Sequence, residues 1–321
     1  MSGTKGLLYH LGGVPLLDVP LPRSGGTVWF VDGTHGLDGN TGKSLSGAKK
    51  TIQDALDEVA EGDTVLVLPK EMAITDTDPG SYAETLIVSK ANISIIGVSR
   101  GRTQGGLPQI KIGAGSTALL TVRGPGCLIA NLGFNGIDST GGGILLDDNG
   151  STKNAFGTTI TGCHFKNCKK SSTSSALGGA ITMDGCPWQI RIQGNTFYKN
   201  VGGVVGLPTH ADGQDIVIED NTFSGTAATV DSYIYIVAGG GGFDGIVVRR
   251  NVFASAIPAL SNGVVVRYMD LTGCTGILAE NYFGCTDTAT GFGAAKATAK
   301  VPTTVGIANN YSDGGLIVRQ A

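Results

Sequence analysis

Charged side chains are scarce in this chain of 321 residues. Lysine, arginine, aspartate and glutamate together make up 15% of it, whereas an average globular domain contains about 25%. The formal net charge is −3, so the composition offers no case for binding nucleic acid, which requires a basic surface. A surface with so few charges indicates that part of it is covered, either by the chain itself or by a partner.

Long apolar runs are absent as well. No stretch approaches the roughly 18 apolar residues of a membrane span. The apolar stretch near the N-terminus is interrupted by His10, Gly12, Gly13 and Pro15, and no small-residue cleavage site follows it, so it does not match a signal peptide. We therefore expect neither a membrane segment nor a secretion signal, and we expect the protein to assemble in the cytoplasm of the cell that makes it.

Paired cysteines are missing too. Six cysteines are scattered along the chain, and Cys163 and Cys168 lack the second ligand pair that a zinc site needs. A chain of this length can bury a core without disulfides, so we expect reduced, mostly buried thiols rather than disulfides. The segment from Gly39 to Ser44 resembles a phosphate-binding loop, but Leu37 stands where that loop requires its first glycine. The sequence therefore predicts no metal and no cofactor.

Glycine, in contrast, is abundant at 52 residues, more than twice its usual share of about 7%, and it accompanies an internal repeat. The repeat consists of two alternating apolar residues, an asparagine and an aromatic residue, as at Ile216, Ile218, Asn221 and Phe223. It recurs around Asn195 and Asn251 and becomes weaker in both directions. Its aromatic anchors stand at positions 134, 165, 197, 223, 253, 283 and 311, so they are 26 to 32 residues apart. Such a period is typical of repeat architectures.

Each repeat contains short strands rather than helices. The apolar residues alternate with period two, and a second short apolar run, such as 179–183 or 233–237, follows most anchors. Glycine, asparagine, aspartate and serine separate the runs and are typical of corners. Strands that repeat in one direction stack in parallel, about 4.8 Å apart. The sequence therefore predicts an all-β chain, a parallel β-helix.

The repeats Ile190–Phe197 and Ile216–Phe223 resemble those of the right-handed, pectate-lyase-like parallel β-helix family. The entry segment, with Val28–Asp32 and Thr51–Leu56, also resembles the usual start of that family, and such openings are frequent in phage virion proteins. The resemblance covers about residues 27 to 315. It implies a right-handed, single-stranded solenoid, but little about activity, because this fold carries lyases, hydrolases, epimerases and inert virion parts.

The chain divides into an N-terminal arm, residues 1–26, and a β-helix domain, residues 27–321. At the start of the domain, residues 51–60 are expected to form an α-helix, because Thr51 and Asp54 make a capping box and an apolar stripe follows. This helix would cap the open N-terminal end of the coil. The arm is rich in apolar residues and proline, and we expect it to be extended. Its candidate partner-binding residues are Leu7, Leu8, Tyr9, Leu11, Leu16 and Leu17.

The asparagine two residues before each aromatic anchor has a structural interpretation. Asparagine tolerates left-handed backbone at a corner, and stacked amides can donate to one rung and accept from the next. The sequence therefore predicts a buried asparagine ladder. Its members are Asn195, Asn221, Asn251, Asn281 and Asn309.

A surface stripe follows from the same alternation. If Ile216 and Ile218 point inward, Val217 points outward, and so does the residue six positions before each aromatic anchor. That column contains four branched apolar residues in succession: Val217, Val247, Ile277 and Val305. An exposed stripe of this kind usually marks an interface, and three coils around an axis can close it. We therefore expect a homotrimer, with cover by the chain's own loops as the alternative.

No catalytic group can be named from the sequence. Candidate acidic or basic groups are Asp147, Asp148, Asp184, His210, Asp212, Asp231 and Asp270, with Arg191, Arg249 and Arg267 as candidate bases. The companions that a galacturonase-like or pectate-lyase-like site needs are missing. His210 and His164 are interpreted as corner residues.

The sequence therefore favours a non-enzymatic phage virion protein, a homotrimeric β-helix that decorates or stabilises a capsid. The arm would bind a major capsid protein or another virion protein. The alternative is a tail-spike-like protein that binds a host-surface polysaccharide, or degrades it as a lyase or hydrolase. A microbial surface repeat protein is a third interpretation, against which the missing secretion signal argues.

Overall fold

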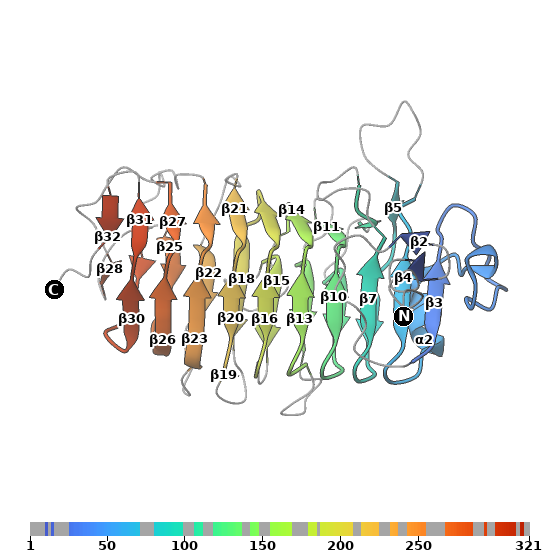
Figure 1. The fold of residues 1–321 in the computed structure, drawn as a ribbon, viewed down its shortest axis with the longest axis horizontal. Helices are drawn as coiled ribbons and strands as arrows, with labels where there is room; N and C mark the ends of the chain where they lie inside the picture. Colours follow the sequence, from blue (N-terminus) through green and yellow to red (C-terminus); the bar gives the residue numbers. More distant parts are fainter. Residues whose placement is uncertain are drawn as a thin grey trace, which may run out of the picture.

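Three parallel β-sheets run along the length of the molecule and enclose one core (Figure 1). The structure is a computed structural model, and it describes residues 10–11, 14–15, 26–70, 80–98, 106–111, 118–136, 142–147, 155–168, 179–184, 187–207, 213–224, 232–236, 243–254, 267–284, 292–293, 299–312 and 315–317. The fold class predicted from the sequence, an all-β right-handed parallel β-helix with one short capping helix, is confirmed. No helix within these ranges is long and apolar enough to cross a membrane.

Sheet 1 has 11 strands and forms the face nearest the viewer in Figure 1. Its order is β3 (Val28–Val31), β4 (Thr64–Val67), β7 (Ser94–Gly97), β10 (Leu128–Ala130), β13 (Thr159–Thr161), β16 (Arg191–Gln193), β20 (Val217–Glu219), β23 (Phe243–Arg249), β26 (Cys274–Ala279) and β30 (Val305–Ala308), with β19 (Gly213–Gln214) beside β23.

Sheet 2 follows sheet 1 after a tight corner and has 10 strands. Its order is β5 (Ser81–Tyr82), β8 (Gln109–Ile110), β11 (Gly133–Asn135), β14 (His164–Lys166), β17 (Thr196–Tyr198), β21 (Thr222–Ser224), β24 (Val252–Phe253), β27 (Tyr282–Phe283), β31 (Asn310–Ser312) and β32 (Gly315–Ile317). Only the last pair, β31 with β32, is antiparallel.

Sheet 3 closes each turn and has 9 strands. Its order is β6 (Leu86–Val88), β9 (Leu120–Val122), β12 (Ile144–Leu146), β15 (Ile181–Asp184), β18 (Gly202–Leu207), β22 (Ser232–Ile236), β25 (Arg267–Asp270), β29 (Ala299–Lys300) and β28 (Phe292–Gly293).

The aromatic anchors set the register of the stack. The rings of Phe134, Phe165, Phe197, Phe223, Phe253 and Phe283 lie in one column inside the coil, with neighbouring ring centroids 4.5 to 5.0 Å apart and planes within 11° of parallel. This spacing matches the separation of parallel strands, so each ring packs on the next without any shift of the backbone. A slip of one residue would turn every ring to the outside.

The N-terminal end of the coil is capped. Helix α2 (Ile52–Glu58) packs against β3, β4 and β6. Its buried residues are Ile52, Ala55 and Leu56. Thr51 accepts a hydrogen bond from the Asp54 amide as predicted. The helix ends two residues earlier than expected because Val59 adopts an extended ψ of 150°.

The outer edge of β3 is occupied as well. A short 3-10 helix, η1 (Leu45–Gly47), lies in the segment that reaches it, and Val31 and Lys49 form a parallel bridge. The amide of Phe30 donates to Gly42, and the amide of Lys49 donates to Phe30. Segment 42–49 therefore uses the hydrogen-bonding groups that sheet 1 would otherwise leave open at this end.

The N-terminal arm is not extended throughout. Strands β1 (His10–Leu11) and β2 (Val14–Pro15) pair antiparallel, with Leu11 opposite Val14. The remaining residues predicted to bind a partner, Leu7, Leu8, Tyr9, Leu16 and Leu17, lie outside the described residues, so this prediction stays untested.

The predicted register of the last rung is wrong by one residue. Val305 pairs with Gly276 and is buried, whereas Gly306 pairs with Ile277 and takes the outward position. Tyr311 pairs with Tyr282 rather than with the anchor Phe283. A tyrosine in the phenylalanine column would have to bury its hydroxyl without a partner, and the outward position leaves that hydroxyl in water.

Candidate functional site

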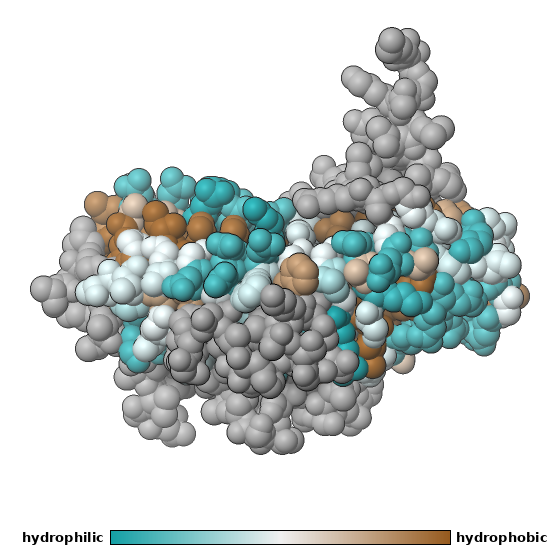
Figure 2. Space-filling view, turned by 90° about the horizontal axis from the view of Figure 1, so that it is seen from below, coloured by the Kyte–Doolittle hydropathy of each residue, from teal (hydrophilic) through white to brown (hydrophobic). Residues whose placement is uncertain are grey.

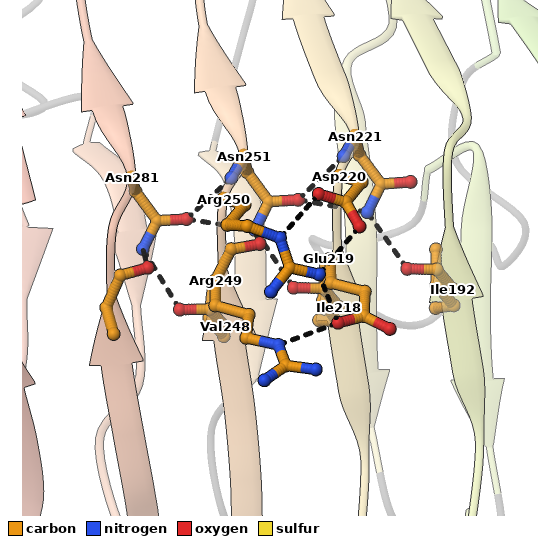
Figure 3. Close-up of polar contacts among 11 residues, drawn as sticks. Ile192, Ile218, Glu219, Asp220, Asn221, Val248, Arg249, Arg250, Asn251 and Asn281 are labelled. Atoms are coloured by element: carbon orange, nitrogen blue, oxygen red, sulfur yellow. Dashed lines mark hydrogen bonds and ion pairs between the residues drawn. The ribbon is translucent and has the colours of Figure 1, made fainter.

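An asparagine ladder lies at the corner between sheets 1 and 2 (Figure 3). In each step the backbone amide and the side-chain Nδ2 of one asparagine both donate to Oδ1 of the next, over distances of 2.9 to 3.1 Å. The members are Asn195, Asn221, Asn251, Asn281 and Asn310, all buried. The fifth member is Asn310 and not Asn309, which follows from the register of the last rung.

The second donor position of each amide is also used. Nδ2 of Asn221 donates to the carbonyl of Ile192 at 2.9 Å, and Nδ2 of Asn251 donates to the carbonyl of Ile218 at 2.9 Å (Figure 3). Each of these two side chains therefore joins three successive rungs. Because the donors and acceptors of the corner are satisfied inside the protein, the ladder offers no open group to a ligand.

The left-handed residue of this corner precedes the ladder asparagine, contrary to the expectation that the asparagine itself is left-handed. The residues with positive φ are Gly194, Asp220, Arg250, Glu280 and Asn309, with φ between 50° and 65°. Asparagine is thus selected at the ladder position for its hydrogen bonds and not for its backbone. The left-handed position projects its side chain into solvent, where Asp220, Arg250 and Glu280 place alternating charges.

Four charged residues form a network beside the ladder (Figure 3). Nε of Arg249 donates to Glu219 at 2.7 Å, and Nη2 of Arg250 donates to the same Oε2 atom at 2.9 Å. Arg250 also binds Asp220 through Nε and Nη2, each over 2.8 Å. These hydrogen bonds from Arg250 hold the pKa of Asp220 below its usual range. The two positive and two negative charges cancel, so the network has no net charge that would indicate an ionic ligand.

An apolar outer face lies on both sides of that charged corner. From sheet 1 it contains the outward residues Val217, Val247 and Ile277, which stand in one column. From sheet 2 it contains Val252, Tyr282 and Tyr311, also in one column, and Leu316 of β32. Ile277 is 40% exposed and Tyr311 is 49% exposed, and Figure 2 shows hydrophobic atoms along the C-terminal half of the molecule, at its left.

The sequence identified only part of this apolar face. Val217, Val247 and Ile277 are where the alternation placed them, whereas Val305 points into the core. The sequence does not reveal the sheet-2 column, because Tyr282 stands next to an anchor and Tyr311 has the spacing of one. The position that indicates this column is the one directly before each anchor. Along the chain it reads Thr222, Val252 and Tyr282.

The carboxylates named from the sequence are not gathered into one site. Asp147 and Asp184 lie on neighbouring rungs at the end of sheet 3, because the residues before them, Leu146 and Met183, are paired. Nε of Arg123 donates to Asp147 at 2.8 Å. Asp270 stands in a different column and accepts hydrogen bonds from the amide and hydroxyl of Thr272. Asp148, His210, Asp212 and Asp231 lie outside the described residues.

The candidate bases are also dispersed. Arg191 and Arg249 belong to sheet 1 and Arg267 to sheet 3, while Asp184 ends β15 of sheet 3 and Asp147 directly follows β12. Within the described ranges no three histidine, cysteine, aspartate or glutamate residues are grouped so that they could hold a metal ion. The four described cysteines, Cys127, Cys163, Cys168 and Cys274, are free and buried. Burial raises the pKa of each thiol to about 12, so these thiols are inert.

Comparisons with known proteins give no family. No protein-family model matches the chain, and no curated protein matches it. Among solved structures the chain is similar to PfbA, a surface adhesin of Streptococcus pneumoniae, at 14% identity and a TM-score of 0.38, over 78% of this chain and 67% of that one. It is also similar to the GH136 lacto-N-biosidase from Eubacterium ramulus, in the native protein at 10% identity and a TM-score of 0.33, over 90% of this chain and 68% of that one. The function therefore has to be argued from this chain's own residues.

Proposed function

We propose that this protein is a non-enzymatic structural β-solenoid that works by associating laterally with copies of itself, as a homotrimer that decorates or stabilises a phage capsid. The observation that carries the proposal is the apolar outer face. Val217, Val247 and Ile277 repeat at the spacing of the rungs, so two solenoids can pack along their lengths without any change in the backbone.

The distribution of the apolar face over two sheets favours a ring. A single flat face that matches itself gives a two-fold dimer, whereas two different faces on one subunit give a head-to-tail contact. Here Ile277 faces out from sheet 1 and Tyr282 faces out from sheet 2, on opposite sides of the corner at Glu280. If sheet 1 of one subunit packs on sheet 2 of the next, three subunits close the ring and cover both columns.

The charged corner supports a specific contact in such a ring. Arg249 and Arg250 are about two-fifths exposed and lie between the two apolar columns. Since each already has an acidic partner in its own chain, burying the edge of this network costs less than burying a lone charge. Charges at the rim of an interface contribute more to orientation than to affinity.

The proposal is tested by the mass of the protein in solution. The double variant Val217→Asp with Val247→Asp places two carboxylates in the sheet-1 column and should turn a trimer into monomers, as measured by light scattering behind a sizing column. Thr159→Asp is the matched control, because Thr159 stands in the same column on β13, between Leu128 and Arg191 and two rungs away from Val217. A double variant that stays trimeric would refute this placement, and a monomeric parent would refute the self-association itself.

A second candidate function is binding of a host-surface polysaccharide. The observation that favours it is the pair Tyr282 and Tyr311, exposed and aligned on neighbouring strands, because tyrosine has an apolar face for a sugar ring and a hydroxyl for hydrogen bonds. The two candidates differ in what Tyr282→Ser with Tyr311→Ser does. If the variant no longer binds host cells but keeps its mass, the two tyrosines bind the polysaccharide. If the variant is no longer a trimer, the two tyrosines belong to the interface between subunits.

A further inference from the structure

The outer face of sheet 1 carries a second apolar line of residues, at the N-terminal end of the coil. Four of its members are aligned by the pairing of β3, β4, β7 and β10: Phe30, Leu66, Ile96 and Ala130. Each of the four follows a residue of the internal core, so it points outward. Ala48 extends the line past Phe30 at the edge of the sheet. We call these five residues the N-terminal column.

The N-terminal column is closed to solvent. Its members are 0 to 4% exposed, although they point away from the internal core. In contrast, Ile277, an outward residue of the same sheet, is 40% exposed. The line continues beyond Ala130 as Thr161, which is half-buried. Outward side chains are closed in this way only where further chain covers the sheet, so the outer face has a cover from the sheet edge to β10.

The apolar residues that pack with the N-terminal column do not form this cover. Within the described ranges they are Val28, Val98 and Leu128, all three half-buried. Val28 and Leu128 are outward residues of β3 and β10, and Val98 directly follows β7. Side chains on one face of a sheet stand beside each other and not above each other. The cover therefore comes from outside sheet 1.

The N-terminal arm, residues 1–26, starts beside this column and can reach all of it. The arm joins β3 directly, and strand β2 lies at the same end of the coil as β3 and β4 (Figure 1). Ten residues separate Pro15 from Gly26 and span about 33 Å when extended. The five positions of the N-terminal column span about 19 Å across the strands. The arm is therefore long enough to lie along the whole column.

The arm also has the composition of such a cover. Leucines stand at positions 7, 8, 11, 16, 17 and 21. Two segments that follow other strands of the column in the sequence are less apolar. Segment 71–79 contains Met72, Ala73 and Ile74, and segment 99–105 contains no apolar residue. Because every member of the column is apolar, an apolar segment is the cover that removes most apolar surface from water.

We propose that the N-terminal column is the docking site of the chain's own arm, whose leucines lie on Leu66, Ile96 and Ala130 in the free protein. Docking hides apolar side chains of the arm and of the sheet from water. A partner that binds the arm has to compete with the column for the same leucines, so docking lowers the arm's apparent affinity for that partner. The docking is independent of the proposed function, whereas the release of the arm by a capsid protein rests on it.

The docking is tested in the full chain by the rate at which trypsin cleaves after Arg23. Leu66→Thr with Ile96→Thr keeps β-branched residues in the strands but weakens the docking, so this rate should rise at least about tenfold. Cleavage confined to the arm distinguishes its release from unfolding of the coil. Val247→Thr is the matched control, because Val247 is an outward residue of the same sheet outside the column. An unchanged rate in the double variant overturns the proposal.

A variant of the arm tests the same contact without any change in the coil. It replaces four leucines by serine: Leu7→Ser, Leu8→Ser, Leu16→Ser and Leu17→Ser. The released arm should expose the N-terminal column, so the full chain should bind the apolar dye ANS more strongly than the parent. Adding Leu66→Thr and Ile96→Thr should remove most of that increase. If the arm variant binds no more dye than the parent, another segment covers the column and the proposal is wrong. The mass of the protein reports on self-association separately, so either proposal can fail without the other.

Discussion

Asn221 and Asn251 lie on neighbouring rungs and are joined twice, because the backbone amide and the Nδ2 atom of Asn221 both donate to Oδ1 of Asn251 at 3.0 Å. Neither side chain is accessible to water. The pair shows why asparagine recurs at this corner: no other side chain offers a planar acceptor and a donor at this short reach. The stability of the corner should therefore depend on the amide itself.

The first prediction concerns that amide. Asn221→Ala removes the acceptor for two donors of Asn195 and the donor for the Ile192 carbonyl. Groups left unpaired in the interior cost about 1–3 kcal/mol, and we expect that loss in the free energy of unfolding, measured by denaturant titration. A variant that unfolds at the parent's midpoint with the same slope would contradict a stabilising ladder.

The second prediction tests the register of the last rung. Asn310→Ala should destabilise the chain by about 1–3 kcal/mol, because Asn310 accepts from both donors of Asn281. Asn309→Gly should cost little or even stabilise, since Asn309 is exposed and its φ of 50° suits glycine. The comparison uses adjacent asparagines, so local position is matched. The opposite ranking in thermal melts would restore Asn309 as the ladder residue.

The third prediction concerns the charged corner. Arg250→Gly removes ion pairs to Asp220 and Glu219, which contribute little to stability because solvent screens them. It also relieves a left-handed φ of 53°, which costs a non-glycine residue about 1–2 kcal/mol. The two effects oppose each other, so we expect a net change within about 1 kcal/mol in low salt. Added salt should shift the balance towards the variant, because salt screens only the ion pairs. A loss of several kcal/mol would mean that the network holds the corner together.

The fourth prediction is a pH dependence at the N-terminal cap. Burial acts to raise the pKa of Asp63, but hydrogen bonds from the Ala60 amide, the Trp29 indole and the Thr27 amide outweigh it, so the pKa lies below its ordinary value. A lowered pKa in the folded state stabilises the fold above the unfolded-state value of about 4, and this contribution is lost as the pH falls through the folded value.

The control for that pH dependence is Asp63→Asn, which cannot titrate. At pH 7 the variant should unfold more easily than the parent, and the difference should shrink below about pH 4. Fluorescence of Trp29, whose indole binds Asp63 at 2.9 Å, reports on the cap. A difference that stays constant from pH 7 to pH 2 would show that the hydrogen bonds of Asp63 do not depend on its charge.

The fifth prediction concerns the N-terminal arm. A chain that starts at Arg23 should fold and assemble like the parent, because the described core begins at Trp29, but it should no longer sediment with capsids. The control is the same assay with the full chain. Aggregation or unfolding of the truncated chain would show instead that the arm belongs to the cap of its own coil.

The interior of the fold was predictable because it follows one rule. Ile192, Ile218 and Val248 alternate with outward residues at a constant offset from Phe197, Phe223 and Phe253, and burial of each ring requires the same register on every rung. The rule fails at Tyr311, where the aromatic residue is not an anchor. Sequence alone could not decide whether Tyr311 points inward or outward, because the answer depends on whether its hydroxyl has a hydrogen-bond partner in the core or only in water.

The outer surface was less predictable for a different reason. An outward residue is judged from its own polarity, and on that basis His164 is an ordinary surface histidine. Its burial depends on what surrounds it across the strands, and Gln109 and Gly133 come from rungs 55 and 31 positions earlier in the chain. Asp147 and Asp184 are 37 positions apart in the sequence, yet the pairing of Leu146 with Met183 puts them on neighbouring rungs.

The two ends of the solenoid limit how far it can grow. Stacked parallel strands resemble the cross-β arrangement of fibrils, in which each new strand adds to a free edge of the same direction. At one end, segment 42–49 occupies the edge of β3. At the other, β32 runs antiparallel to β31 and presents sheet 2 with the wrong direction for another parallel rung. The coil is therefore protected against end-to-end polymerisation into amyloid-like filaments at both of these sheet edges, while its sides stay open for assembly of fixed size.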